Sequence, residues 1–214
     1  GNQVVNTANL DQLAEQSAVF KNTWDSNPVC MPNRCSILTG RMPTAHGVIF
    51  NDRSLDWNSN TFVRQFKRAD YSTTLIGKSH IQHGASRNSI VPFRGEGAFE
   101  TPHGEHWDKI ENFEQYLDGD SPEIDDFYGF EEIELAIDDG ARVSGHHLLW
   151  ALDRGANKND LLVDYNKEAP GHKRSDHWWQ IYQLPYHEDN HATTFFTKRT
   201  IQHIKENPAR TSNG

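Results

Sequence analysis

Cysteine is scarce in this chain, which has only Cys30 and Cys35 among its 214 residues. A small disulfide-stabilised fold and a cysteine-rich zinc module both need more cysteines, so the sequence excludes them. At the start of a helix, this short spacing does not suit the geometry of a disulfide between the two. We therefore expect two free thiols, with Cys35 in the hydrophobic core.

Long apolar runs and an excess of basic residues are also missing. No stretch approaches the ~20 apolar residues that span a bilayer. The chain has 21 Lys and Arg against 30 Asp and Glu, which gives a formal net charge of −9 with histidine neutral. This acidic balance argues against a nucleic-acid partner and against adsorption to an anionic membrane. The length suits one sizeable core or a domain with a long insertion.

The most informative segment is residues 30–41, Cys-Met-Pro-Asn-Arg-Cys-Ser-Ile-Leu-Thr-Gly-Arg. Pro32 presets a helical φ and has no N–H to donate, so it suits the first turn of a helix, and Gly40 can end that helix. Cys30 then lies at the helix N-terminus, where unpaired N–H groups and the dipole favour an anion. Arg34 adds a positive charge. The segment therefore predicts a potential nucleophile beside an oxyanion site.

This segment closely resembles the signature of the sulfatase family, Cys-x-Pro-x-Arg followed by Thr-Gly. The matching residues are Cys30, Pro32, Arg34, Thr39 and Gly40. In that family the cysteine is oxidised to formylglycine, whose hydrated aldehyde is the nucleophile. The resemblance implies the same modification of Cys30 by a formylglycine-generating enzyme. The alternative is a buried structural cysteine in a turn before a helix, the usual state of a free cysteine.

Residues 6–20 resemble the family segment that precedes this motif, although Ala8 stands where proline is usual. Asn9 can cap a helix with three apolar residues on one face. These residues are Leu10, Leu13 and Ala14. A short strand is expected over residues 20–24, leading to the Cys30 loop.

A helix and a strand are expected after the motif. Asn60 can cap a helix over residues 61–69, and a strand rich in β-forming residues follows over residues 71–76. This order resembles the family element Gly-Tyr…Gly-Lys-x-His, with Asp70 in place of its first glycine.

Lys78 and His80 emerge from the C-terminal end of that strand, where open α/β sheets gather functional groups. In the family, the lysine and histidine of this element bind the sulfate ester and handle protons near the leaving oxygen. The resemblance implies the same roles for Lys78 and His80.

The region of residues 87–190 is irregular, acidic and aromatic, and we expect it to shape the substrate region. A short strand is expected around Ile133 and a helix over residues 143–152. Four tryptophans could line a pocket, although aromatic residues commonly pack in cores: Trp107, Trp150, Trp178 and Trp179. An amphipathic helix is expected over residues 193–207, with Pro208 as its stop. Its apolar side would contain Phe196, Thr200, Ile201 and Ile204.

Two histidine patterns raise the question of a metal site. Residues 187–191 match His-Glu-x-x-His, the zinc metalloprotease pattern, which needs both histidines on one face of a regular helix. Pro185 precedes closely and Asp189-Asn190 favours helix caps, so we interpret these residues as a solvated turn. We also interpret His146-His147 as surface residues rather than ligands.

The resemblance implies an α/β fold, an alkaline-phosphatase-like core with helices that flank a mixed, largely parallel sheet. It covers about the first half of a family member without its opening strand, so we expect an incomplete catalytic domain. Its expected parts are a core with the nucleophile motif over residues 1–86, a substrate-region insertion over residues 87–190 and a core helix over residues 191–208.

The activity implied by the resemblance is hydrolysis of a small-molecule or carbohydrate sulfate ester. Formylglycine at residue 30 would act with Ca²⁺ or another divalent cation, whose other ligands we expect outside this chain. Arg34 suits planar oxyanion recognition, Lys78 would stabilise the transferring group, and His80 would assist at the leaving oxygen. We expect the chain to be inactive alone.

Two alternatives stay open. Related enzymes with the same cysteine motif cleave phosphonate or phosphate esters. The chain could also be a non-catalytic fragment that only binds anions. An Asp-Asp pair in an opening strand of the full gene would support a hydrolase, and its loss would support the binding fragment.

Overall fold

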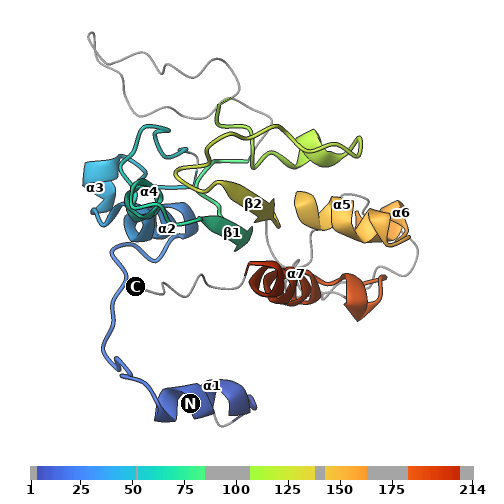
Figure 1. Cartoon of the computed structure of the whole chain (residues 1–214), viewed down its shortest axis with the longest axis horizontal. Coiled ribbons are helices and arrows are strands. Elements are labelled where there is room, and N and C mark those ends of the chain that lie inside the picture. The colour runs from blue at the N-terminus through green and yellow to red at the C-terminus, as the bar shows by residue number, and fades with distance from the viewer. Residues whose placement is uncertain (1–3, 52, 85–106, 138–142, 163–182, 208–214) are drawn as a thin grey trace.

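The computed structural model describes residues 4–51, 53–84, 107–137, 143–162 and 183–207 (Figure 1). The helices in these segments are α1 (Ala8–Glu15), α2 (Cys30–Thr39), α3 (Pro43–His46), α4 (Phe62–Arg68), α5 (His146–Asp153), α6 (Lys158–Leu161) and α7 (Ala192–Glu206). Two short 3₁₀ helices are η1 (Phe113–Tyr116) and η2 (Glu188–Asn190). The strands are β1 (Thr74–Gly77) and β2 (Glu132–Leu135).

Strands β1 and β2 form a parallel pair in which Leu75 lies opposite Ile133. The strand predicted around Ile133 is therefore confirmed. The strand predicted over residues 71–76 forms later, as β1, because Thr73 is engaged by the turn before β2. Its hydroxyl donates to the Gly129 carbonyl at 2.7 Å, and its carbonyl accepts the Glu131 N–H at 2.9 Å.

The main hydrophobic core joins α2, the sheet and the loops between the strands. Its buried members are Met31, Cys35, Val48, Leu55, Ile81, Ile110, Tyr116, Phe127, Tyr128, Leu135 and Ile137. Cys35 is 0% exposed, so its predicted place in the core is confirmed. The core draws on both residues 1–86 and residues 87–190, and the proposed division of the chain into three parts stays a prediction.

Two helices use a different cap from the predicted one. The N-cap of α4 is Thr61 rather than Asn60, and its hydroxyl oxygen accepts the Arg64 N–H at 3.2 Å. In α1 the N-cap is Thr7, and Asn9 lies inside the helix. Both segments contain several polar residues that can cap a helix, so the local sequence leaves more than one possible start.

The segment before α2 differs further from expectation. Helix α1 buries none of its residues, and Leu10 is 65% exposed. No strand forms over residues 20–24, because a strand needs a neighbour for its backbone groups and none of the described residues pairs with this segment. Figure 1 shows α1 set apart from the other helices.

Helix α5 begins at His146, three residues later than predicted. The Ile137 N–H donates to the Ser144 carbonyl at 3.4 Å, and the Ser144 hydroxyl donates to the Ile137 carbonyl at 2.8 Å. These bonds hold Ser144 in an extended pairing, so the helix starts after it.

The surface interpretation of His146-His147 is wrong. His147 is 0% exposed, and its Nε2–H donates to the Asn190 carbonyl at 2.7 Å. Burial lowers the pKa of His147 to about 4, so the ring is neutral at pH 7. His146 accepts the Leu135 N–H at its Nδ1 atom, at 3.1 Å. Both histidines therefore serve packing and backbone hydrogen bonding.

Helix α7 matches the predicted range closely but packs with a different face. Phe195 is 0% exposed and stacks on the His147 ring, with 5.1 Å between the ring centroids. Arg199 lies on the same side and forms an ion pair with Glu134 of β2. Much of the predicted apolar side is exposed, including Ile201 at 48% and Ile204 at 62%. The partners on α5 and β2 decide which face is buried.

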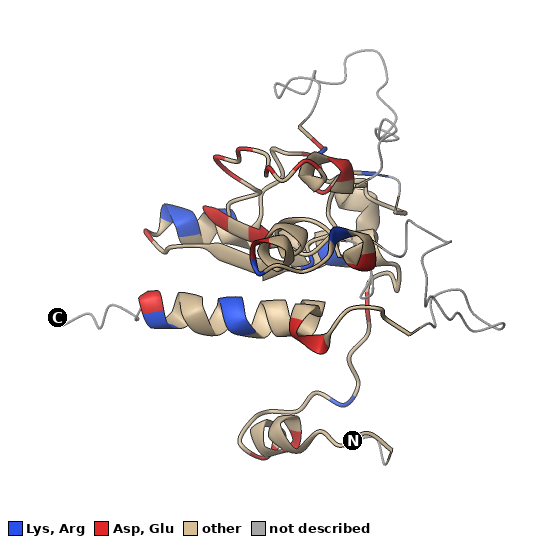
Figure 2. Cartoon of the chain, turned by 90° about the vertical axis from the view of Figure 1, so that its right-hand side faces the viewer, with Lys and Arg blue, Asp and Glu red and all other residues tan. Residues whose placement is uncertain are grey.

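Charges of both signs lie along α7 (Figure 2). A nucleic-acid surface would instead gather basic residues on one face. Among the described residues, no helix is both long and apolar enough to cross a membrane.

Candidate active site

Helix α2 places Cys30 at its first position. Val29 is the N-cap, and Gly40 ends the helix in the left-handed conformation, with φ of 66°. Pro32 lies in the first turn, as predicted. Cys30 is exposed whereas Cys35 is buried. Among the described residues, nothing buries Cys30, so it differs from the buried structural cysteine that was the alternative.

The N-terminus of α2 offers fewer unpaired N–H groups than the sequence predicts. The Met31 N–H donates to the side-chain oxygen of Asn51 at 3.0 Å, and the Asn33 N–H donates to the Val29 carbonyl at 3.1 Å. The third helical residue is proline, which has no N–H. Only the Cys30 amide lacks an acceptor in the part of this turn that the structure describes. An anion here would therefore depend mainly on cationic side chains.

Arg34 connects α2 to the loop that follows β1. Its Nη1 atom donates to the Lys78 carbonyl at 3.0 Å and to the Ser79 carbonyl at 3.5 Å. Arg34 is four residues after Cys30, so the two side chains share one face of the helix. The Cys30 motif and the Lys78–His80 loop therefore lie together. A guanidinium has five N–H donors, so these bonds leave capacity for an oxyanion.

The loop after β1 carries the predicted site residues in a specific backbone conformation. Lys78 and His80 are both partly exposed. His80 has φ of 53°, in the left-handed region that residues with a side chain seldom adopt. The roles of these two residues in binding and proton transfer stay predictions.

Glu111 belongs to the candidate site, and no pattern in the sequence predicts it. It is 2% exposed, and its carboxylate accepts the N–H groups of three successive residues. These residues are His80, Ile81 and Gln82. Burial raises the pKa of Glu111 to about 7, while the three amides and nearby Arg34 act in the opposite direction. No local motif marks this residue, because its partners are about thirty positions away in the chain.

No group of three or more His, Cys, Asp or Glu side chains that could hold a metal ion occurs within the described segments. In the His-Glu-x-x-His pattern, His187 accepts the Asp189 N–H at 3.2 Å and caps η2. His191 accepts the Thr193 N–H at 3.2 Å and caps α7. The two histidines belong to two different caps, so the turn interpretation is confirmed.

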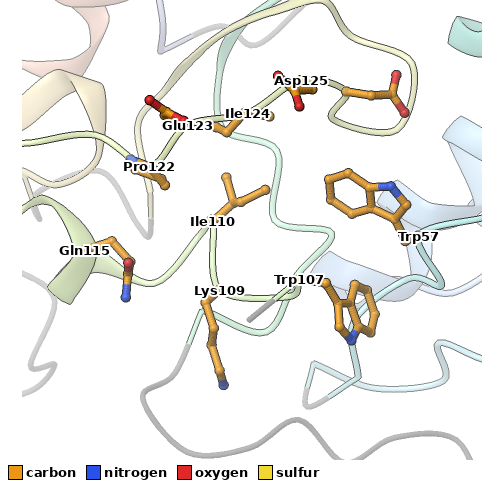
Figure 3. Close-up of a pocket in the computed structure, with 10 residues that line it drawn as sticks. Trp57, Trp107, Lys109, Ile110, Gln115, Pro122, Glu123, Ile124 and Asp125 are labelled. Carbon is orange, nitrogen blue, oxygen red and sulfur yellow. The ribbon is translucent and has the colours of Figure 1, made fainter. Parts of the chain in front are cut away.

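A cavity of about 510 Å³ adjoins the Glu111 segment (Figure 3). Trp57 and Trp107 lie on one side of it and Gln115 on the other. Its remaining walls are Lys109, Ile110, Pro122, Glu123, Ile124, Asp125 and Asp126. Trp107 therefore lines a pocket, as one interpretation of the sequence suggested. Trp150 instead packs against Phe195, and Trp178 and Trp179 lie outside the described residues.

Comparison with known proteins finds similarity to one family. Residues 1–160 match the family model described as Sulfatase. The chain is 38% identical over 82 residues to an arylsulfatase of Clostridium perfringens, an alignment that covers 38% of this chain and 17% of the relative. It is 33% identical over 129 residues to an ulvan-active sulfatase of Formosa agariphila, covering 58% of this chain and 24% of the relative.

An N-acetylglucosamine-6-O-sulfatase of Bacteroides thetaiotaomicron is 31% identical over 81 residues, or 38% of this chain and 14% of the relative. The chain therefore spans about a quarter or less of the length of these three relatives.

Proposed function

Because this chain belongs to the sulfatase family, we propose that it carries the nucleophile segment of an enzyme that hydrolyses sulfate monoesters. One observation supports this most strongly. Arg34, one turn after exposed Cys30, bonds the backbone of the loop that holds Lys78 and His80. The matched relatives are several times longer than the aligned segments, so the activity is proposed for a protein that contains this chain.

Cys30 is proposed as the precursor of formylglycine, which would supply a geminal diol as the nucleophile. Its exposure at the first position of α2 suits this role. Cys35 is excluded from it, because it is buried and burial raises the pKa of its thiol to about 12.

The cationic residues around Cys30 would recognise the sulfate and assist its transfer. Arg34 presents a planar guanidinium on the same helical face as Cys30, which suits an oxyanion. Lys78 would stabilise negative charge on the transferring group. As the bond between sulfur and the ester oxygen breaks, the leaving alkoxide gains charge and His80 would supply a proton to it.

The family also uses a divalent cation such as Ca²⁺. The described residues do not fit such an ion, because no cluster of three potential ligands occurs among them. We therefore derive no step through the cation. For the substrate we propose a carbohydrate sulfate ester, since two relatives are named for ulvan and for N-acetylglucosamine 6-O-sulfate.

Mass spectrometry tests the nucleophile. After co-expression with a formylglycine-generating enzyme, trypsin should release the peptide Asn22–Arg34 with an aldehyde at residue 30. The peptide Cys35–Arg41 from the same digest is the internal control and should keep its thiol. A Pro32→Ala variant should lose the modification, because it breaks the motif. An unmodified thiol at residue 30 in the unsubstituted chain would refute the assignment.

A further inference from the structure

The loop that carries Lys78 and His80 has a backbone conformation that its own residues do not favour. β1 ends at Gly77 with φ of 130°, a value that residues with a side chain rarely adopt. His80 then turns into the left-handed region, with φ of 53°. Such a conformation persists only where surrounding contacts over-determine it. The contacts that hold this loop are therefore part of how the site is built.

Glu111 provides those contacts from inside the protein. Its Oε2 atom accepts the N–H of Ile81 at 2.8 Å and of Gln82 at 2.7 Å, and its Oε1 atom accepts the N–H of His80. The Glu111 N–H in turn donates to the side-chain oxygen of Gln82 at 3.3 Å. We call Glu111 with these three amides the Glu111 clamp. Its partners begin at the residue that has the left-handed conformation.

Arg34 holds the same loop from the side of α2. Its bonds to the Lys78 and Ser79 carbonyls precede the three clamped amides directly in sequence. A cation therefore binds the carbonyls of the loop and an anion binds its amides. Side chains therefore hold the backbone of five consecutive residues, the carbonyl groups of residues 78–79 and the N–H groups of residues 80–82.

The charge on Glu111 decides how well the clamp works. A carboxylate can accept all three N–H groups, whereas a protonated carboxyl has an O–H that competes with them. The titratable groups that face Glu111 are Arg34 and Cys35 from α2, Tyr116 from η1, and Tyr128. Of these, Arg34 is the cation that favours the carboxylate.

We propose that Glu111 is a positioning residue, whose carboxylate holds residues 80–82 so that Lys78 and His80 are presented beside the N-terminus of α2. The clamp is independent of any chemistry at Cys30. Its importance for binding a sulfate group rests on the function proposed above.

Backbone NMR of the whole chain tests the clamp directly. As the pH changes from about 5 to about 9, the amide signals of His80, Ile81 and Gln82 should shift together with one midpoint. The expected midpoint is that of Glu111, whose pKa burial raises to about 7. Signals that shift with unrelated midpoints would overturn the proposal.

Three variants separate positioning from folding. Glu111→Gln should abolish the common titration, and Glu111→Asp, which keeps a carboxylate, should restore it at least in part. Glu114→Gln is the matched control, because Glu114 is exposed and close in sequence. Its three amide titrations should equal those of the unsubstituted chain. A common titration that persists in Glu111→Gln would refute the clamp.

Inorganic sulfate then tests the role of the clamp in anion binding. Sulfate should shift the Lys78–His80 amides of the unsubstituted chain, and Glu111→Gln should weaken its affinity roughly tenfold or more. Equal affinity in both proteins would overturn the positioning role. If the amides titrate but sulfate binds neither protein, the oxyanion role in the proposed function fails while the clamp stands. Should Glu111→Gln not fold, the sulfate affinity of the unsubstituted chain is measured against pH. The affinity should fall as the pH drops through the midpoint of the three amide signals. An affinity that does not fall there would overturn the positioning role.

Discussion

The guanidinium of Arg34 donates a hydrogen bond to the main-chain carbonyl of Lys78 at 3.0 Å, across 44 residues of sequence. The contact joins α2, which carries the proposed nucleophile Cys30, to the loop that carries Lys78 and His80. It also brings two cationic residues close together in the fold, which suits the binding of an anion.

Lys78→Ala should lower the catalytic rate for every sulfate ester in an active protein that contains this chain. Loss of one donor to a developing oxyanion typically costs about a hundredfold to a thousandfold, or about 2.7–4 kcal/mol. Steady-state kinetics would measure the change. Lys67→Ala is the control, because Lys67 lies on α4 and pairs with Asp126. Near-normal activity of Lys78→Ala would remove it from the site.

His80→Ala should impair the hydrolysis of alkyl sulfates far more than that of nitrophenyl sulfates. A good leaving group needs little protonation in the transition state, whereas an alkoxide needs it strongly. Rates for the two ester types in the same variant provide the comparison. Equal losses would exclude His80 as the acid and leave it a binding or structural residue.

The isolated chain should not bind Ca²⁺ tightly and should show no sulfatase turnover above background. The described residues contain no cluster of three potential ligands, so a cation bound among them would lack most of its coordination shell. Isothermal calorimetry with Ca²⁺ measures this directly. Stoichiometric, high-affinity binding would show that this chain holds a complete metal site.

His147 should make folding stability depend on pH. Its pKa is lowered to about 4 in the folded chain by burial, against about 6.5 when unfolded. The unfolded state therefore binds more protons below about pH 6.5, and stability is lost as the pH falls from there towards about 4. The loss attributable to this group is about 3 kcal/mol when complete.

Urea unfolding at neutral and acidic pH would measure that loss as the difference between the unsubstituted chain and His147→Gln. His187→Gln is the control, because the His187 side chain is 70% exposed. Its pH dependence should match that of the unsubstituted chain. An unchanged pH dependence in His147→Gln would contradict the prediction.

Iodoacetamide should alkylate Cys30 in the folded chain and Cys35 only after unfolding. Cys30 is exposed, whereas Cys35 is 0% exposed and has a thiol pKa raised by burial to about 12. The thiolate is the reactive species, so Cys35 is protected by both effects. Peptide mapping would distinguish the two sites, and Cys30→Ser should show no labelling under native conditions. Native labelling of Cys35 would be inconsistent with its place in the core.

Several features could be predicted because neighbouring residues decide them. The start and end of α2 follow from Pro32 and Gly40, which constrain the backbone at their own positions. The turn over residues 187–191 follows from residues that favour turns over helix interiors, although its two N-caps are His187 and His191 rather than Asp189 or Asn190. The N-caps of α4 and α1 are Thr61 and Thr7 rather than the predicted asparagines. The sequence does not distinguish them, because nearby asparagines offer equivalent oxygens.

Features that depend on distant partners could not be predicted from neighbouring residues. Phe195 rather than Ile201 is buried on α7, because His147 and Glu134 lie against that face. In the sequence, Glu111 is one of many acidic residues. Only the folded chain places its carboxylate against the N–H groups of residues 80–82. The local sequence determined which residues can cap a helix, form a turn or act as a nucleophile, acid or anion ligand. The tertiary structure decided which of these residues come into contact. The reason is that a buried charge is stable only where other groups pair with it or form hydrogen bonds to it.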